Sequence, residues 1–194
     1  MDDYARGIAR LLDRLEIDEA IIGGLSMGGY VTFALFRLAP ERFSGMILAD
    51  TRPGPDSPDG RAARAKMREL LAAEGPSAIA DRMLPKLLSG DANADLAARV
   101  RRMIEAVPAP AIDAALAAMM DRPDSTPDLP RISCPTLVVV GERDEVTPLA
   151  EAERMQTLMP RSRLTIVPGA GHLSNVERPD KFAQALDDFL VAPM

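Results

Sequence analysis

The 194-residue sequence predicts an α/β fold, a doubly wound, mostly parallel sheet with a helical cap insertion. Short apolar runs typical of buried strands alternate with apolar residues at helical spacing, and this alternation favours a parallel sheet. The middle of the chain, 52–130, shows no strand pattern and is rich in Ala, Arg, Met and Pro. We therefore expect a core formed by 1–51 and 131–194, and a helical cap formed by 52–130.

The first part of the chain is predicted to alternate helix, strand, helix and strand. Apolar residues at helical spacing over 4–15 predict the first helix, and the apolar run 20–25 predicts a short buried strand. A glycine turn follows, and the apolar face of 27–38 predicts a second helix that Pro40 ends. The run GMILA at 45–49 predicts the second strand.

The insertion that follows is predicted to contain helices only. Its Pro- and Asp-rich runs, 52–59 and 122–130, look like two hinges. A helical insertion after a strand's carboxyl end would stand over the edge where α/β sheets bind ligands. The expected helices lie near 59–74, 76–89, 93–106 and 109–121.

The last part of the chain returns to alternating strands and helices. The continuous β-branched run at 136–140 predicts a strand buried on both faces. Thr147 and Pro148 look like the cap and first position of the next helix. The run 163–167 predicts the fourth strand, and apolar residues at helical spacing after Pro179 predict the last helix.

Composition excludes several classes of protein. The net charge of −6 argues against a nucleic-acid partner. The acidic start lacks a signal-peptide core, and the longest apolar stretch, 20–36, is cut by glycines, so we expect no membrane partner. The single cysteine, Cys134, cannot form an internal disulfide, which favours a cytoplasmic location.

One serine lies in a motif that carries chemistry. Gly24-Leu25-Ser26-Met27-Gly28 matches G-x-S-x-G between a predicted strand and a predicted helix, which is the context of a nucleophile elbow. Such a tight turn needs small residues two positions before and two after the serine. The following helix would point free N–H groups toward a developing oxyanion. The alternative is a glycine-rich turn without chemistry.

A base and an acid are available at the same edge of the predicted sheet. The only histidine, His172, follows the fourth strand in a glycine-rich loop, and a serine needs such a base. Asp144 follows the third strand, so the order Ser26, Asp144, His172 is that of a nucleophile-elbow triad. Three other carboxylates are rivals for the acid: Asp50, Glu142 and Glu145.

On these motifs the chain resembles the α/β-hydrolases of the lidded esterase and enol-lactonase-like kind. The resemblance implies that Ser26 is the nucleophile, Asp144 the acid and His172 the base. It also implies that Met27 lends its backbone N–H to the oxyanion hole and that 52–130 is the cap. The matching stretches are GLSMGG at 24–29, LADTRP at 48–53, PTLVVVGERDEVTP at 135–148 and PGAGHLSNVERP at 168–179.

The predicted function is that of a serine hydrolase that cleaves a small-molecule carboxylic ester or lactone through an acyl-enzyme on Ser26. No cofactor is implied, and one cysteine with one histidine cannot form a usual zinc site. Thioesterase, C–C hydrolase and cofactor-free haloperoxidase activities share these motifs, so the sequence does not separate them. The alternative from another class is a catalytically impaired remnant that acts as an interaction module.

The chain differs from members of this family at its N-terminal end. Family members begin with several strands before the helix expected at 4–15, and one of their loops, usually carrying His-Gly, supplies a second oxyanion donor. This chain has neither. We therefore expect the strand 20–25 to be an open edge that a homo-oligomer covers. We also expect weak activity, because losing one oxyanion donor costs about 10²–10³ in turnover.

Overall fold

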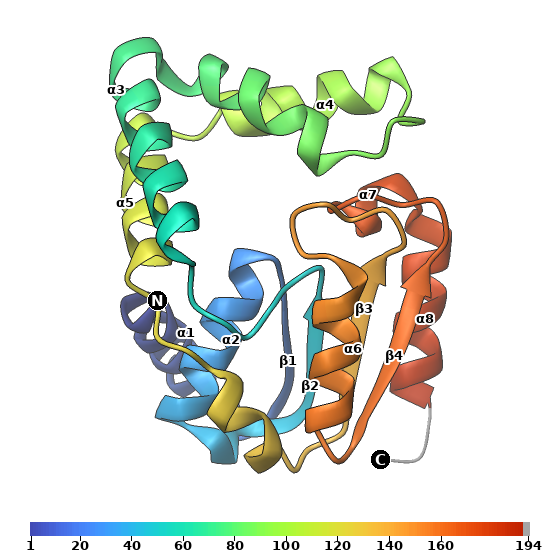
Figure 1. The fold of residues 1–194 in the computed structure, drawn as a ribbon. Coiled ribbons are helices and arrows are strands. Elements are labelled where there is room, and N and C mark those ends of the chain that lie inside the picture. The colour runs from blue at the N-terminus through green and yellow to red at the C-terminus, as the bar shows by residue number, and fades with distance from the viewer. Residues whose placement is uncertain (192–194) are drawn as a thin grey trace.

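Residues 1–191 are described by a computed structural model, in which four parallel strands form one sheet (Figure 1). Each strand pairs in parallel with the next along the chain. The predicted parallel sheet is confirmed, and β2 begins two residues earlier than expected. The strands, in spatial order, are β1 (Ala20–Leu25), β2 (Phe43–Ala49), β3 (Thr136–Gly141) and β4 (Ser162–Val167).

Helices pack on both faces of this sheet, as a doubly wound fold requires. On one face lie α2 (Met27–Leu38), with α1 (Asp2–Arg14) packed against it, and α6 (Leu149–Leu158). On the other face lies α8 (Pro179–Val191), which contacts β3 and β4. The remaining short helices are η1 (Pro40–Arg42), η2 (Thr126–Arg131) and α7 (Ser174–Glu177).

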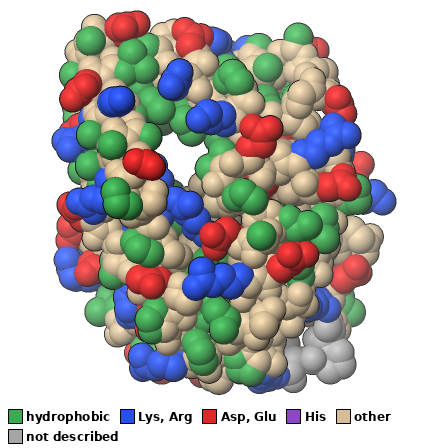
Figure 2. Space-filling view, in the orientation of Figure 1, with side chains coloured by type: hydrophobic (Ala, Val, Ile, Leu, Met, Phe, Trp, Pro, Cys, Tyr) green, Lys and Arg blue, Asp and Glu red, His purple; other side chains and the backbone are tan. Residues whose placement is uncertain are grey.

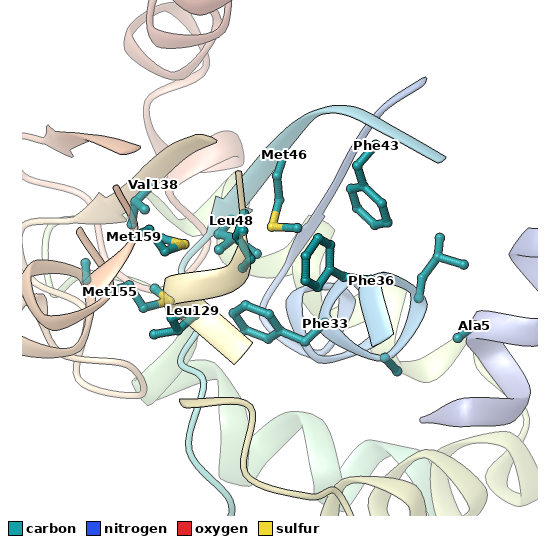
Figure 3. Packing of buried hydrophobic residues seen from close by; sticks show 14 of the residues in the cluster. Ala5, Phe33, Phe36, Phe43, Met46, Leu48, Leu129, Val138, Met155 and Met159 are labelled. Atoms are coloured by element: carbon teal, nitrogen blue, oxygen red, sulfur yellow. The ribbon is translucent and has the colours of Figure 1, made fainter. Parts of the chain in front are cut away.

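The core forms because successive strand residues point to opposite faces. Met46 and Leu48 of β2 face α2, whose Phe33 and Phe36 lie against them (Figure 3). A second cluster on the opposite face includes Ala49, Leu137, Val139 and Phe189. The central strands β2 and β3 are thus covered on both faces, which fixes the carboxyl ends of these strands in place.

The segment between β2 and β3 leaves the sheet and contains helices only, and we call 52–130 the helical segment (Figure 1). Its long helix α3 (Pro58–Leu87) breaks at Gly75, where φ is 78° and ψ is −173°, just before Pro76. The break divides α3 into two limbs, which match two separately predicted helices. Two further helices, α4 (Ala94–Glu105) and α5 (Ala109–Met120), pack against α3.

Among residues 1–191, no single helix is long and apolar enough to cross a membrane. Only α4 and α5 taken together reach that length and composition, and they are bent by 92° relative to one another.

A buried ion pair ties the two ends of the helical segment together. Arg122 is 5% exposed; its Nη1 lies 2.9 Å from Oδ1 of Asp56, and its Nη2 donates to the Gly54 carbonyl at 3.0 Å. The guanidinium also stacks on the Tyr30 ring, 4.1 Å from its centroid. Burial alone would raise the pKa of Asp56, but Arg64 and Arg122 hold that pKa below its ordinary value. The two predicted hinges are therefore joined.

The first strand is an edge of the sheet. Within residues 1–191, β1 pairs with β2 alone, and Gly23 on it is exposed. This agrees with the expected open edge. That a homo-oligomer covers it stays a prediction.

We predict that Asp56→Ala lowers the free energy of unfolding by about 3 kcal/mol, because it leaves the buried Arg122 guanidinium without its carboxylate. Urea denaturation followed by circular dichroism measures the change. The matched control is Asp121→Ala, which removes an exposed partner of Arg61 and should leave the urea midpoint unchanged. Equal midpoints for the Asp56→Ala variant and the parent would contradict the prediction.

Candidate active site

Ser26 lies at the sharp turn between β1 and α2. Its φ of 53° and ψ of −113° fall in a region that non-glycine residues rarely adopt, so the turn is strained. The end of β2 holds it in place. The Ser26 N–H donates to the Ala49 carbonyl at 2.9 Å, and the Thr51 hydroxyl donates to the Ser26 carbonyl at 2.8 Å. The sequence analysis missed Thr51, although it lies in the LADTRP stretch.

The glycines around Ser26 are required by close backbone contacts, but not all as predicted. A Cβ on Gly24 would lie 2.2 Å from the Gly28 carbonyl carbon, so the residue two before Ser26 must be glycine. A Cβ on Gly28 would meet no atom within 4 Å, so the expectation for that position is wrong. The constraint falls on Gly29, where a Cβ would lie 2.4 Å from Oγ1 of Thr51.

The structure brings Ser26, His172 and Asp144 together at the carboxyl edge of the sheet. Nε2 of His172 lies 2.8 Å from Oγ of Ser26, and Nδ1 lies 2.9 Å from Oδ2 of Asp144. His172 is only 2% exposed, so its ring has little freedom to leave this position. A proton on Nδ1 satisfies the carboxylate and leaves Nε2 free to accept the proton of Ser26.

The loop after β3 holds the Asp144 carboxylate as an anion. Its Oδ1 accepts hydrogen bonds from the N–H groups of Val146 and Thr147, at 2.8 and 2.9 Å. Its Oδ2 accepts from the Thr147 hydroxyl at 2.6 Å. Burial alone would raise the pKa of Asp144, but the bonds to His172 and Thr147 lower it below its ordinary value.

Thr147 therefore has a different role from the predicted helix cap. Its hydroxyl is turned to Asp144, and α6 begins at Leu149 with Pro148 at the capping position. The hydroxyl also lies 3.4 Å from Nδ1 of His172. Thr147 supports both the acid and the ring, which the local Thr-Pro pattern did not reveal.

The three other candidates for the acid do not contact His172 through a hydrogen bond within residues 1–191. Oδ1 of Asp50 accepts from the Gly141 N–H at 2.8 Å, and Oδ2 accepts from the Ser174 hydroxyl at 2.5 Å. Glu142 is exposed and accepts from the Gly169 N–H, and Glu145 is exposed too. Of the four candidates, only Asp144 has a hydrogen bond to His172 within residues 1–191.

Asp50 nonetheless links two chain segments of the site by hydrogen bonds. It is fully buried, with a positive φ of 44°, and it joins the end of β3 to the residue two after His172. Burial raises the pKa of Asp50 to about 6, against the lowering effect of the bonds from Ser174 and Gly141. Sequence reasoning weighed Asp50 only as a rival acid and missed this bridging position.

A second carboxylate, Glu177 of α7, links the histidine loop to the helical segment. Its Oε1 accepts from the Gly171 N–H at 2.7 Å. Its Oε2 accepts from both the N–H and the hydroxyl of Ser89, at 2.9 and 2.5 Å. The Leu173 N–H also donates to the Leu87 carbonyl at 3.1 Å. The end of α3 is therefore bonded directly to the residue after His172, and Ser89 is linked through Glu177 to the residue before it.

Met27 is the first residue of α2, directly after Ser26. Its N–H is one of those that a helix leaves without an intrahelical acceptor, so it is placed to donate to a group bound at Ser26. Among residues 1–191, no group of three or more His, Cys, Asp or Glu side chains is arranged to hold a metal ion.

Comparisons with known proteins show the family and the fold of this chain. The model of the alpha/beta hydrolase family matches residues 1–185. The structure of an esterase from Thermogutta terrifontis with malate bound has a TM-score of 0.92 and 40% identity, covering 96% of this chain and 70% of that one.

Two curated relatives add to this. The chain is 28% identical over 196 residues to 3-oxoadipate enol-lactonase 1 from Acinetobacter baylyi, covering 98% of this chain and 71% of the relative. It is 30% identical over 173 residues to the pimeloyl-(acyl-carrier protein) methyl ester esterase of Nitrosomonas europaea, covering 84% and 68%.

We predict that Asp50→Asn gains stability relative to the parent as the pH rises. The pKa of Asp50 in the folded chain, about 6, lies above its ordinary value of 3.8, so the parent loses stability as the pH rises through this window. Asparagine does not titrate. The difference in free energy of unfolding, variant minus parent, should increase by roughly 2–3 kcal/mol between pH 4 and pH 7. Urea denaturation across that range measures it, and a flat or falling difference would contradict it.

Proposed function

Because the chain belongs to the alpha/beta hydrolase family, we propose that it cleaves a carboxylic ester or lactone through an acyl-enzyme on Ser26. The observation that carries the proposal is the continuous hydrogen-bonded path from Oγ of Ser26 through the His172 ring to Asp144. The relatives named above are two esterases and an enol-lactonase, which supports an ester or lactone carbonyl as the target.

In the proposed first step, Oγ of Ser26 attacks the substrate carbonyl carbon while Nε2 of His172 takes the hydroxyl proton. The buried Asp144 carboxylate stabilises the imidazolium that forms. The tetrahedral oxyanion accepts a hydrogen bond from the Met27 N–H and lies near the positive end of α2. Collapse of the intermediate breaks the C–O bond, and the imidazolium gives its proton to the leaving oxygen.

The second step regenerates the serine. His172, neutral again, takes a proton from a water molecule that attacks the acyl carbon of the ester on Ser26. The second tetrahedral intermediate releases the carboxylic acid product, and Oγ of Ser26 recovers its proton. In a lactone, the acyl and alcohol parts leave as one molecule.

We also propose that the helical segment acts as the cap of this site. The carbonyl of its Leu87 accepts from the N–H of Leu173, directly after His172, and Glu177 bridges its Ser89 to the Gly171 N–H. Thr51, directly before the segment, donates to the Ser26 carbonyl. A cap fixed at both places would limit the access of water and define the space for the substrate.

We expect Ser26→Ala to abolish both hydrolysis of 4-nitrophenyl butyrate and labelling by a fluorophosphonate probe. His172→Gln and Asp144→Asn should lower turnover by about 10²–10⁴, because they remove the base or its orienting partner. Release of 4-nitrophenolate and gel fluorescence measure these effects. The control Ser133→Ala changes an exposed serine before β3 and should behave like the parent. Hydrolysis by the Ser26→Ala variant at the parent rate would refute the assignment.

We further expect Thr147→Val to lower kcat by about tenfold while leaving KM nearly unchanged. The substitution keeps the volume of the side chain but removes the hydroxyl that donates to Asp144. The matched control is Thr157→Val on α6, whose hydroxyl donates to the Glu153 carbonyl of the same helix. An unchanged kcat, or an equal loss in both variants, would show that Thr147 does not position the acid.

A further inference from the structure

Glu177 is a buried carboxylate that the proposed reaction does not use. It is 6% exposed, it ends the four-residue helix α7, and it takes part in no ion pair within residues 1–191. Its two oxygens accept from three neutral donors, the N–H of Gly171 and the N–H and hydroxyl of Ser89. Burying a carboxylate without a cation is costly. Only a carboxylate, however, offers acceptors to both groups, because an amide would turn a donor toward one of them.

The residue before His172 has close neighbours on two sides. A Cβ on Gly171 would lie 2.7 Å from the Ser89 nitrogen and 2.9 Å from Oε1 of Glu177. On the other side, a Cβ on Gly141, the last residue of β3, would lie 2.0 Å from the Gly171 carbonyl oxygen. Gly171 is therefore enclosed between the sheet and the helical segment.

The backbone on both sides of His172 is bonded to the helical segment. Before the histidine, Glu177 joins the N–H of Gly171 to Ser89. After it, the Leu173 N–H donates to the carbonyl of the last residue of α3 at 3.1 Å. The triad fixes the ring of His172, while these bonds fix the chain that carries it.

The other end of α7 is anchored to the sheet. The hydroxyl of Ser174, its first residue, donates to Asp50 at the end of β2. Figure 2 shows an opening between the helical segment and the sheet, and in Figure 1, drawn in the same orientation, α7 lies beside that opening. The helical segment is thus not packed on the sheet along its whole length. Local contacts such as that of Glu177 are therefore important for its position.

We propose that Glu177 is a positioning residue for His172, through which the end of the helical segment sets the place of the imidazole relative to Ser26. The inference rests on the proposed function and adds to it a residue outside the triad. Transfer of the Ser26 proton to Nε2 of His172 depends on their 2.8 Å contact, and a small displacement of a base costs a large factor in rate. Without the carboxylate, Gly171 and Ser89 lose their common acceptor, and the loop can move away from the helical segment.

The single histidine of the chain makes the effect directly measurable. With ¹⁵N-labelled histidine, the ring signals come from His172 alone, and the proton on Nδ1 reports its bond to Asp144. Glu177→Gln keeps the size of the side chain but presents a donor to one of its two partners. We expect the Nδ1 proton signal to shift or broaden, and kcat for 4-nitrophenyl butyrate to fall about tenfold with KM nearly unchanged. The control Glu153→Gln, on the exposed surface of α6, should match the parent in both measurements.

A second variant separates positioning from general destabilisation. Ser89→Ala removes one of the three donors to Glu177 and keeps its backbone N–H. It should lower kcat about threefold in the parent and by a smaller factor in the Glu177→Gln variant, because both changes act through one contact. Circular dichroism checks that each variant is folded at the assay temperature.

An unchanged Nδ1 signal or an unchanged kcat in the Glu177→Gln variant would overturn the inference, and so would losses that are additive with Ser89→Ala. If Glu177→Gln does not fold, Ser89→Ala gives the same two readouts, and parent-like values there overturn it as well. The proposed function fails by a different result, which is hydrolysis by the Ser26→Ala variant at the parent rate. If the parent cleaves no ester, the Nδ1 signal alone decides whether Glu177 positions His172.

Discussion

The carboxyl end of β2 holds together the three loops that carry Ser26, Asp144 and His172. Its backbone carbonyl at Ala49 and the Thr51 hydroxyl fix the turn around Ser26. The Asp50 carboxylate bonds to Gly141, the last residue of β3, and to Ser174, the first residue of α7. A fully buried carboxylate is costly, and hydrogen bonds from both sides offset part of that cost. The relative position of the three loops therefore depends on one short stretch of chain.

The parallel sheet explains why such a stretch can exist. All four strands point the same way, so the loops after them meet at a single edge. The two ring nitrogens of His172 can therefore bond to Ser26 and to Asp144, although all three side chains are short. The strained backbone of Ser26 is tolerated because Gly24 and Gly29 let β1, α2 and Thr51 approach closely.

The helical segment is held in two places by different chemistry. At its root, the buried Arg122 joins Asp56 and the Gly54 carbonyl, so both hinge runs are held by one side chain. At the second place, the Leu173 N–H donates to the carbonyl of Leu87, the last residue of α3, and Glu177 accepts from Ser89, two residues further on. The break at Gly75 lets α3 run from the first of these places to the second.

The sequence by itself determined the strands, the helices and the positions of Ser26 and His172, because periodicity, glycine turns and a single imidazole are local properties of the chain. It could favour Asp144 over Asp50 by order alone, and it assigned Thr147 to a helix cap. Only the tertiary structure decided which carboxylate meets His172, where the Thr147 hydroxyl points, and that Gly29 rather than Gly28 has no room for a side chain. These outcomes depend on atoms that other elements bring within a few ångströms, and no window along the chain contains that information.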